Sequence, residues 1–315
     1  MPEASTVPHL YEVTRRTLQG DPKELPAVWL YDERGSHLYE RITRLPDYYP
    51  PRREAELLHA NAREIAGRTR AATLVELGSG DARRTRFLLD ALTELGTLRR
   101  FAPVDVSEQI LRASAAAIAA DYPALEVEPI AGDFVHGLDA IPAEGPRLVA
   151  FLGSTLGNLY PAQRAELLTT LAGELDADDA LLLGLDLVKD TTRLERAYHD
   201  PTGVTEAFVR NALVAVNREL DATFDQRRFA YDPQWDPQRE WMDIGLRALA
   251  PHTVSVRRLG LELAFAAGER LRVEISAKFR HETFERELAG AGLAAASWWT
   301  DRAGDFALVL ARPEE

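Results

Sequence analysis

The chain has 315 residues, enough for one large domain or two modest ones, and its 46% apolar and 28% charged content is ordinary for a globular protein. The net charge is −13, and no long run of lysine and arginine supplies the basic face that a nucleic-acid binder needs, so we expect no nucleic-acid partner. The absence of cysteine excludes disulfides and thiolate metal sites and favours a reducing, cytoplasmic setting. The apolar runs are too short to span a bilayer, so we expect no membrane partner.

The first fifty residues are rich in turns and aromatic side chains, and they do not have the pattern of a strand–helix unit. From about residue 54 the pattern changes to an alternation of helices and strands. Alternation of this kind indicates parallel βαβ units and a sheet covered on both faces. The predicted strands cover residues 73–77, 101–106, 127–131, 148–153 and 180–188, and the predicted helices cover residues 54–68, 87–92, 110–120 and 162–175.

The alternation stops at Lys189. The next segment contains a long predicted helix over residues 204–220 and an alternating stretch over residues 254–261. The first pattern then resumes, with a helix over residues 284–291 and strands over 294–299 and 306–311. We therefore predict a doubly wound, Rossmann-like α/β domain formed by residues 53–188 plus 279–315. Residues 1–52 plus 189–278 form a second, inserted domain.

Small or acidic residues stand at the ends of three successive predicted strands, where open α/β sheets bind their ligands. The Gly-Ser-Gly turn at residues 78–80 follows the first strand and lets the backbone approach a ligand. Asp105 ends the second strand, where a carboxylate can accept both hydroxyls of a ribose. Asp133 ends the third strand and can accept an adenine amino group, while Phe134 beside it offers a surface to the ring. Together these residues predict a site for a nucleoside cofactor.

Each of these signals is weak alone, because Gly-x-Gly is usually a turn and a strand-end Asp is often a helix cap. The main rival is a nicotinamide-binding fold, which requires a third glycine where Arg83 stands. S-adenosylmethionine has no pyrophosphate, so the missing glycine favours it. We predict a class I S-adenosylmethionine-dependent methyltransferase. The seven histidines have no metal-ligand spacing, and we expect no metal.

In this fold class the segment after the fourth strand, residues 151–159, lies beside the reactive methyl group. Its Asn158 is similar to the Asn of amino-methylating DNA enzymes, but Leu159-Tyr160-Pro161 follows in place of their Pro-Pro-aromatic motif. We expect the amide to hold a carboxylate or an amine of a small substrate instead.

Several motifs, spread over nearly the whole chain, resemble those of the histidine-specific Nα-methyltransferases of ergothioneine biosynthesis. The resemblance implies that S-adenosylmethionine is the methyl donor and S-adenosylhomocysteine the product. It also implies that L-histidine is methylated three times on its α-amine to give the betaine hercynine. The motifs are Trp29-Leu30-Tyr31-Asp32, Gly35-Ser36, Ile42-Thr43-Arg44-Leu45-Pro46-Asp47-Tyr48-Tyr49-Pro50, Val75-Glu76-Leu77-Gly78-Ser79-Gly80, residues 151–159, Asp186-Leu187-Val188-Lys189-Asp190 and Glu274-Ile275-Ser276.

The same resemblance implies roles for single residues. Asn158 and Tyr198 match the positions that hold the substrate carboxylate, and Tyr31 lies near the amine, so Tyr31 and Asn158 are the expected catalytic residues. Ile244 stands where relatives are expected to have Met, which keeps the position apolar. The remaining matches are substrate contacts at Gly153, Tyr48, Glu274 and Ser276, the last three around the imidazole, and cofactor contacts at Tyr48, Gly78, Ser79, Arg84, Asp105, Asp133 and Phe134.

Simpler interpretations stay open. Aromatic residues near a chain end usually belong to a core, and Glu274 and Ser276, two apart on a strand-like stretch, share a face that can simply be solvated. The alternative functions are methylation of another aromatic amino acid or an indole derivative, and non-catalytic binding of S-adenosylmethionine. A closed two-domain pocket needs no partner chain, so we expect a monomer.

Overall fold

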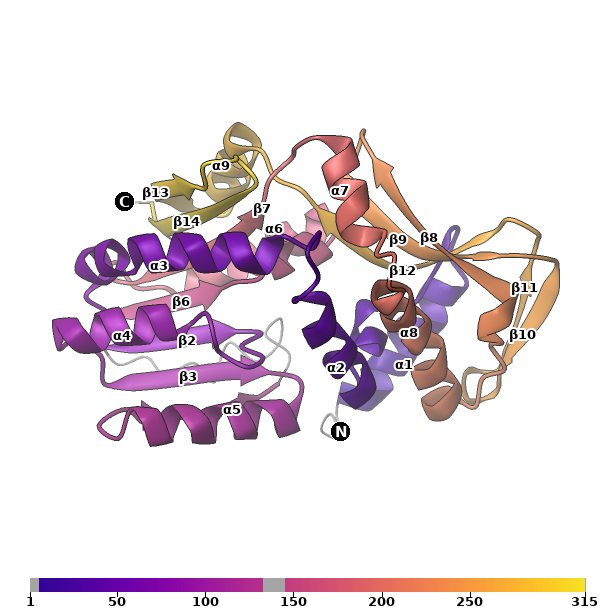
Figure 1. Ribbon diagram of the computed structural model, residues 1–315. Helices are drawn as coiled ribbons and strands as arrows, with labels where there is room; N and C mark the ends of the chain where they lie inside the picture. The colour runs from indigo at the N-terminus through magenta and orange to yellow at the C-terminus, as the bar shows by residue number, and fades with distance from the viewer. Residues whose placement is uncertain (1–5, 133–144, 315) are drawn as a thin grey trace. The chain divides into compact units, whose positions relative to one another are not determined.

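The computed structural model describes residues 6–132 and 145–314 (Figure 1). The chain folds into two compact units. Unit 1 consists of Met1–Tyr49 and Lys189–Ala277, and unit 2 of Pro50–Val188 and Lys278–Glu315. Each unit has its own sheet.

Unit 2 is built on a mixed sheet with the strand order β13-β14-β7-β6-β2-β3-β4. Strands β2, β3, β4, β6 and β7 run parallel, whereas β14 is antiparallel to both β7 and β13, and a short β5 pairs with β3. This is the doubly wound arrangement with a closing hairpin that the strand pattern predicts. The strands are β2 (Thr73–Leu77), β3 (Arg100–Asp105), β4 (Glu126–Val127), β5 (Ile130–Ala131), β6 (Arg147–Phe151), β7 (Ala180–Asp186), β13 (Leu293–Thr300) and β14 (Phe306–Pro313).

The order of the strands creates a topological switch point between β2 and β6. The chain leaves β2 for β3 on one side and later returns to pair β6 with the other side of β2. Open α/β sheets bind ligands outside the carboxyl ends of their strands at such a point. The loops that begin after Leu77 and Phe151 are therefore where the fold itself predicts a site.

Helices cover the sheet of unit 2, and its core consists of their apolar faces and the strand interiors. In α3 the buried Leu58, Ile65 and Ala66 pack with Leu88 and Leu92 of α4, as helical spacing predicts. The helices of this unit are α3 (Pro50–Thr69), α4 (Arg86–Leu95), α5 (Glu108–Asp121), α6 (Pro161–Glu174) and α9 (His281–Gly290). Their positions agree with the predicted ones to within a few residues.

Unit 1 has a four-stranded sheet of order β1-β12-β9-β8 and a separate β10–β11 hairpin. Helix α8 has a broadly apolar surface that packs into a single core with the strands. The elements are α1 (Thr6–Leu18), β1 (Lys23–Glu24), α2 (Glu33–Ile42), α7 (Thr191–Tyr198), α8 (Val204–Leu220), β8 (Phe229–Asp236), β9 (Trp241–Ala248), β10 (His252–Val256), β11 (Leu261–Phe265) and β12 (Arg270–Ala277).

The first fifty residues contain the helices α1 and α2, for which no helix was predicted, and α2 begins where the Asp32 carboxylate caps the Gly35 N–H at 2.8 Å. Two sequence predictions are wrong in detail. The alternating stretch 254–261 is not one strand, because the short 3-10 turn Arg257–Leu259 separates β10 from β11. The strand predicted over 127–131 is two short strands, β4 and β5.

Within residues 6–132 and 145–314, no helix is long and apolar enough to cross a membrane.

Candidate active site

The Gly-Ser-Gly turn lies at the carboxyl end of β2. Gly78 and Gly80 have φ angles of +69° and +52°, which glycine adopts more readily than other residues. The N–H groups of Gly78 and Ser79 both donate to the Val104 carbonyl, at 2.9 and 3.1 Å, and this ties the turn to β3. A Cβ at Gly78 or Gly80 would meet no atom of the described chain within 4 Å. The turn therefore presents bare backbone to open space, as close approach of a ligand requires.

Asp105 ends β3 beside this turn, and backbone donors fix its carboxylate. Gly80 N–H donates to Oδ2 at 2.9 Å and Ser107 N–H donates to Oδ1 at 2.8 Å. An ionised carboxylate has about four acceptor sites, so each oxygen keeps capacity for one more donor. The half-buried Asp105 is thus held ready to accept two neighbouring hydroxyls, which fits the ribose of S-adenosylmethionine.

Glu76, one residue before the end of β2, is a buried carboxyl group. Its Oε1 accepts a hydrogen bond from the Thr85 hydroxyl at 2.5 Å. Burial raises the pKa of Glu76 to about 8, against the lowering effects of Thr85 and Arg84. The side chain is therefore protonated in the folded protein at pH values where it is ionised in the unfolded chain.

This pKa predicts a pH-dependent stability. Between about pH 4.5 and pH 8 the folded state binds a proton at Glu76 that the unfolded state has lost, so the free energy of unfolding falls as pH rises. Urea unfolding of the parent and of Glu76→Gln at several pH values measures this. We expect the parent to lose up to about 1.4 kcal/mol per pH unit relative to the variant. A stability difference that does not change with pH would contradict the assignment.

The loop after β6 begins with two consecutive residues in the left-handed region, Gly153 at φ +77° and Ser154 at φ +56°. The Ser154 hydroxyl accepts the Asp186 N–H of β7 at 2.9 Å, which helps to hold this conformation. The 3-10 turn η3 (Thr155–Asn158) follows, so the half-buried Asn158 ends a turn that starts from a fixed backbone.

A buried carboxylate on α3 joins the two loops. Glu54 Oε1 accepts the Gly153 N–H at 2.6 Å, and Oε2 lies 2.8 Å from Nε of Arg84. Arg84 follows the glycine turn, so Glu54 contacts both strand-end segments of the switch point.

In unit 1 the polar candidates lie on β12 and meet tyrosines from distant parts of the chain. The Tyr31 hydroxyl donates to Glu274 Oε1 at 3.3 Å, and the Tyr198 hydroxyl donates to Ser276 Oγ at 2.8 Å. Glu274 and Ser276 pair across the sheet with Ile244 and Met242 of β9, both part of the apolar core. The two polar side chains therefore share the core-facing side of the sheet, and Ile244 is the cross-strand neighbour of Glu274.

Aromatic rings surround these two pairs. Tyr31 makes edge contacts with Tyr39 and Phe208 at centroid distances of 5.8 and 5.5 Å, and Tyr48 makes one with Tyr198 at 6.1 Å. Burial raises the pKa values of Tyr31 and Tyr48 well above their usual value. For Tyr31 the negative charge of Glu274 is the second cause. Both hydroxyls are thus neutral donors at physiological pH.

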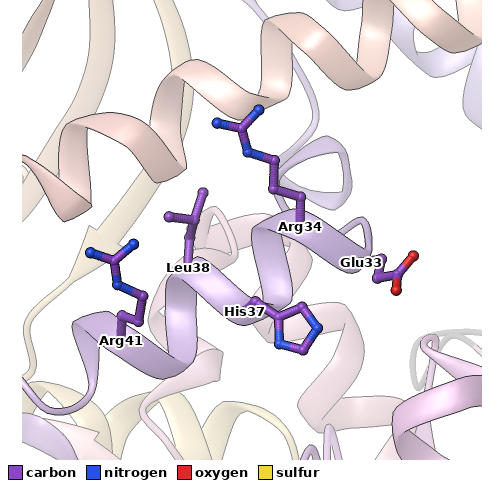
Figure 2. A pocket seen from close by; sticks show the side chains of 5 residues that line it. All are labelled: Glu33, Arg34, His37, Leu38 and Arg41. Atoms are coloured by element: carbon purple, nitrogen blue, oxygen red, sulfur yellow. The ribbon is translucent and has the colours of Figure 1, made fainter.

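A separate hollow lies along α2 and is lined by Glu33, Arg34, His37, Leu38 and Arg41 (Figure 2). Four of these side chains are exposed and only Leu38 is buried. None of them is among the residues that the sequence predicts for cofactor or substrate.

The structure groups the predicted residues into two sets. In unit 2 the glycine turn and Asp105 are joined by hydrogen bonds, and Arg84 is linked to Gly153 through Glu54. In unit 1 Tyr31 meets Glu274, and Tyr48 and Ser276 both meet Tyr198. Asp133 and Phe134 lie outside the described residues.

Sequence reasoning named Glu76 only as part of the motif over residues 75–80. It missed Glu54, Thr85 and Tyr231, whose hydroxyl donates to the Tyr198 carbonyl at 3.0 Å. A signal existed for Glu54, because it occupies the apolar stripe of α3 with Leu57 and Leu58. An acidic residue at such a position indicates a buried partner.

These features define a class: a doubly wound α/β protein whose glycine turn and strand-end carboxylate suit a nucleoside ligand at the switch point of the sheet. Comparison with known proteins narrows it. Residues 10–313 match the family described as "Histidine-specific methyltransferase, SAM-dependent", and the chain belongs to this family. It is therefore an S-adenosylmethionine-dependent methyltransferase.

Two mycobacterial relatives are similar over most of their length. The histidine N-alpha-methyltransferase of Mycolicibacterium smegmatis is 53% identical over 94% of this chain and 92% of the relative. That of Mycobacterium tuberculosis is 52% identical over 93% of this chain and 92% of the relative. The ergothioneine biosynthesis protein 1 of Neurospora crassa is 28% identical over 89% of this chain, which spans 32% of that larger protein.

Proposed function

We propose that this protein transfers methyl groups from S-adenosylmethionine to the α-amine of L-histidine until the trimethylated betaine, hercynine, is formed, as the first step of ergothioneine biosynthesis. Unit 2 binds the cofactor, unit 1 is an inserted domain that binds the amino acid, and a single chain is sufficient. The family supports the reaction class, and the two mycobacterial relatives support the substrate.

The observation that carries the choice of histidine is the pair of polar contacts, Tyr31–Glu274 and Tyr198–Ser276, on the core-facing side of a sheet. An imidazole has one N–H donor and one acceptor nitrogen in its neutral form. Glu274 can accept that N–H, and the Ser276 hydroxyl can donate to the other nitrogen. A site with such groups rejects apolar rings, because its own polar atoms would be left without partners.

In unit 2 the described residues fit the cofactor. We assign Gly78, Ser79 and Arg84, which follow β2, to the cofactor, and Asp105 to its ribose hydroxyls. The assignment of Asp133 and Phe134 to the adenine comes from the sequence alone, because both lie outside the described residues. The family resemblance also assigns Tyr48 to the cofactor. When bound, S-adenosylmethionine supplies a methyl group on a positively charged sulfur.

Positioning supplies most of the acceleration, since methyl transfer is an in-line displacement. The amine must be neutral when it attacks. The family resemblance assigns Asn158 and Tyr198 to the substrate carboxylate, and it assigns Tyr31, a neutral hydroxyl, to the amine. A carboxylate beside the amine would keep it protonated, whereas amide and phenol groups leave it free to lose a proton and to rotate between rounds.

Incubation of the protein with S-adenosylmethionine and each standard amino acid, followed by mass spectrometry, tests the substrate. We expect histidine alone to gain methyl groups, three in number. Preferential methylation of tyrosine or tryptophan would contradict the assignment of Glu274 and Ser276 to an imidazole. Cofactor binding without transfer to any amino acid would contradict the enzymatic function itself.

A further inference from the structure

Glu54 is a buried acidic residue whose carboxylate occupies space left by a glycine on the neighbouring strand β7. Its side chain is 0% exposed, and Gly184 stands opposite it in the middle of β7. A Cβ at Gly184 would lie 2.1 Å from Glu54 Oε1 and 3.3 Å from the Phe306 ring. Glycine weakens the interior of a strand. Its presence in the fully buried strand β7 therefore indicates that a larger side chain at this position would displace the Glu54 carboxylate.

Both oxygens of Glu54 are used, one for each loop. Oε1 receives the Gly153 N–H and Oε2 faces the Arg84 guanidinium. Burial raises the pKa of Glu54, and Arg84 and the Gly153 N–H are the two groups that lower it again. Arg84 and Gly153 are themselves neighbours, because a Cβ on Gly153 would lie 3.4 Å from an Arg84 nitrogen.

The two loops need such a link, because neither is fixed by its strand alone. Gly153 and Ser154 occupy left-handed conformations in succession, and for a residue other than glycine this costs roughly 1 kcal/mol or more. Arg84 has a flexible side chain that is 30% exposed, so its direction depends on a partner. The carboxylate supplies that partner and holds the backbone of the neighbouring loop at the same time.

We propose that Glu54 is a positioning residue of the methyl-transfer site, which sets the direction of Arg84 after β2 and the backbone of Gly153 after β6 as one unit. This inference rests on the proposed function for the roles of Arg84 at the cofactor and of the β6 loop at the substrate. Loss of the Glu54 charge therefore weakens cofactor binding through Arg84, without any contact between Glu54 and the cofactor.

Calorimetric titration with S-adenosylhomocysteine, in the absence of any amino acid, tests this independently of the histidine assignment. Glu54→Gln keeps the size of the side chain and its acceptor for Gly153 but removes the ion pair with Arg84. We expect its Kd for S-adenosylhomocysteine to rise about tenfold. In a double-mutant cycle, Glu54→Gln should add little to Arg84→Gln, because both remove the same link. Additive effects, or an unchanged Kd in Glu54→Gln, would overturn the positioning role.

A second buried ion pair in unit 2 gives the matched control. Asp179 contacts Arg147 at 2.6 Å, at the amino ends of β6 and β7, the opposite end of these strands from the loops. Asp179→Asn should lower the free energy of unfolding at least as much as Glu54→Gln and leave the Kd for S-adenosylhomocysteine unchanged. Equal weakening of binding in both variants would mean that Glu54 acts only through stability.

A measurement on the unaltered protein tests the proposal even if the Glu54 variants fold poorly. The amide hydrogen of Gly153 should exchange slowly with solvent in the absence of ligands, because it is bonded to a buried carboxylate. Fast exchange of this amide would show that Glu54 does not hold the loop.

Discussion

Replacement of Glu274 by alanine is expected to lower kcat/KM for histidine about 100-fold, because a hydrogen bond to a charged group contributes up to about 3 kcal/mol and the Tyr31 hydroxyl also loses its acceptor. The structure gives Glu274 a contact with Tyr31 and a cross-strand neighbour, Ile244, in the apolar core. Among the residues that the structure describes, Glu274 is the one carboxylate to which the Tyr31 hydroxyl donates. The lost acceptor therefore has no ready substitute.

Steady-state kinetics with histidine and calorimetry with S-adenosylhomocysteine separate the two sides of the site. We expect the affinity of Glu274→Ala for S-adenosylhomocysteine to equal that of the parent. Glu262→Ala is the matched control, since Glu262 lies exposed on β11 of the same unit and should leave both values unchanged. Histidine kinetics like those of the parent in Glu274→Ala would remove this residue from ring recognition.

Replacement of Gly78 by alanine should have the reverse pattern, with a loss on the cofactor side. At φ +69° a methyl group adds backbone strain of roughly 1 kcal/mol, and it projects into the open space in front of the turn. We expect the Kd for S-adenosylhomocysteine to rise roughly 10- to 100-fold, or about 1.4–2.8 kcal/mol. Calorimetry measures this directly.

Gly96 provides the control for strain. It ends α4 at φ +76°, and a Cβ there would also meet open space. Gly96→Ala should therefore lose similar stability in urea unfolding and keep its affinity for S-adenosylhomocysteine. If Gly78→Ala binds as tightly as Gly96→Ala, the turn does not approach the cofactor.

The centre of the unit 2 sheet could be predicted because β2, β6 and β7 are short, fully buried apolar runs that alternate with amphipathic helices. The 73–77 strand and the helix over 204–220 have the predicted bounds. The sheet of unit 1 gave no such signal. Nearly every residue of β9 is buried, so the strand does not alternate, and β8 contains Pro233, which is tolerated because β8 is an edge strand.

The candidate site also has a part that the sequence predicts and a part that it does not. Gly78 and Asp105 stand at predicted strand ends, so their position follows from the fold rule for open sheets. The Tyr31–Glu274 contact joins residues 243 positions apart, and no local period predicts it. The family resemblance singled out both residues, while their mutual hydrogen bond required the structure. Neither the fold rule nor the family resemblance singled out Glu54, since helical periodicity alone assigns its position to the core.

The most direct test of the function follows the transferred methyl groups. The protein is incubated with histidine and S-adenosylmethionine carrying a ¹³C-labelled methyl group, and the product is examined by nuclear magnetic resonance. We expect a single labelled resonance, from three equivalent methyl groups on the α-nitrogen. The imidazole ring protons should still titrate with pH, changed only by the effect of the new positive charge. A label on a ring nitrogen, or no label on histidine, would contradict Nα-methylation by this protein.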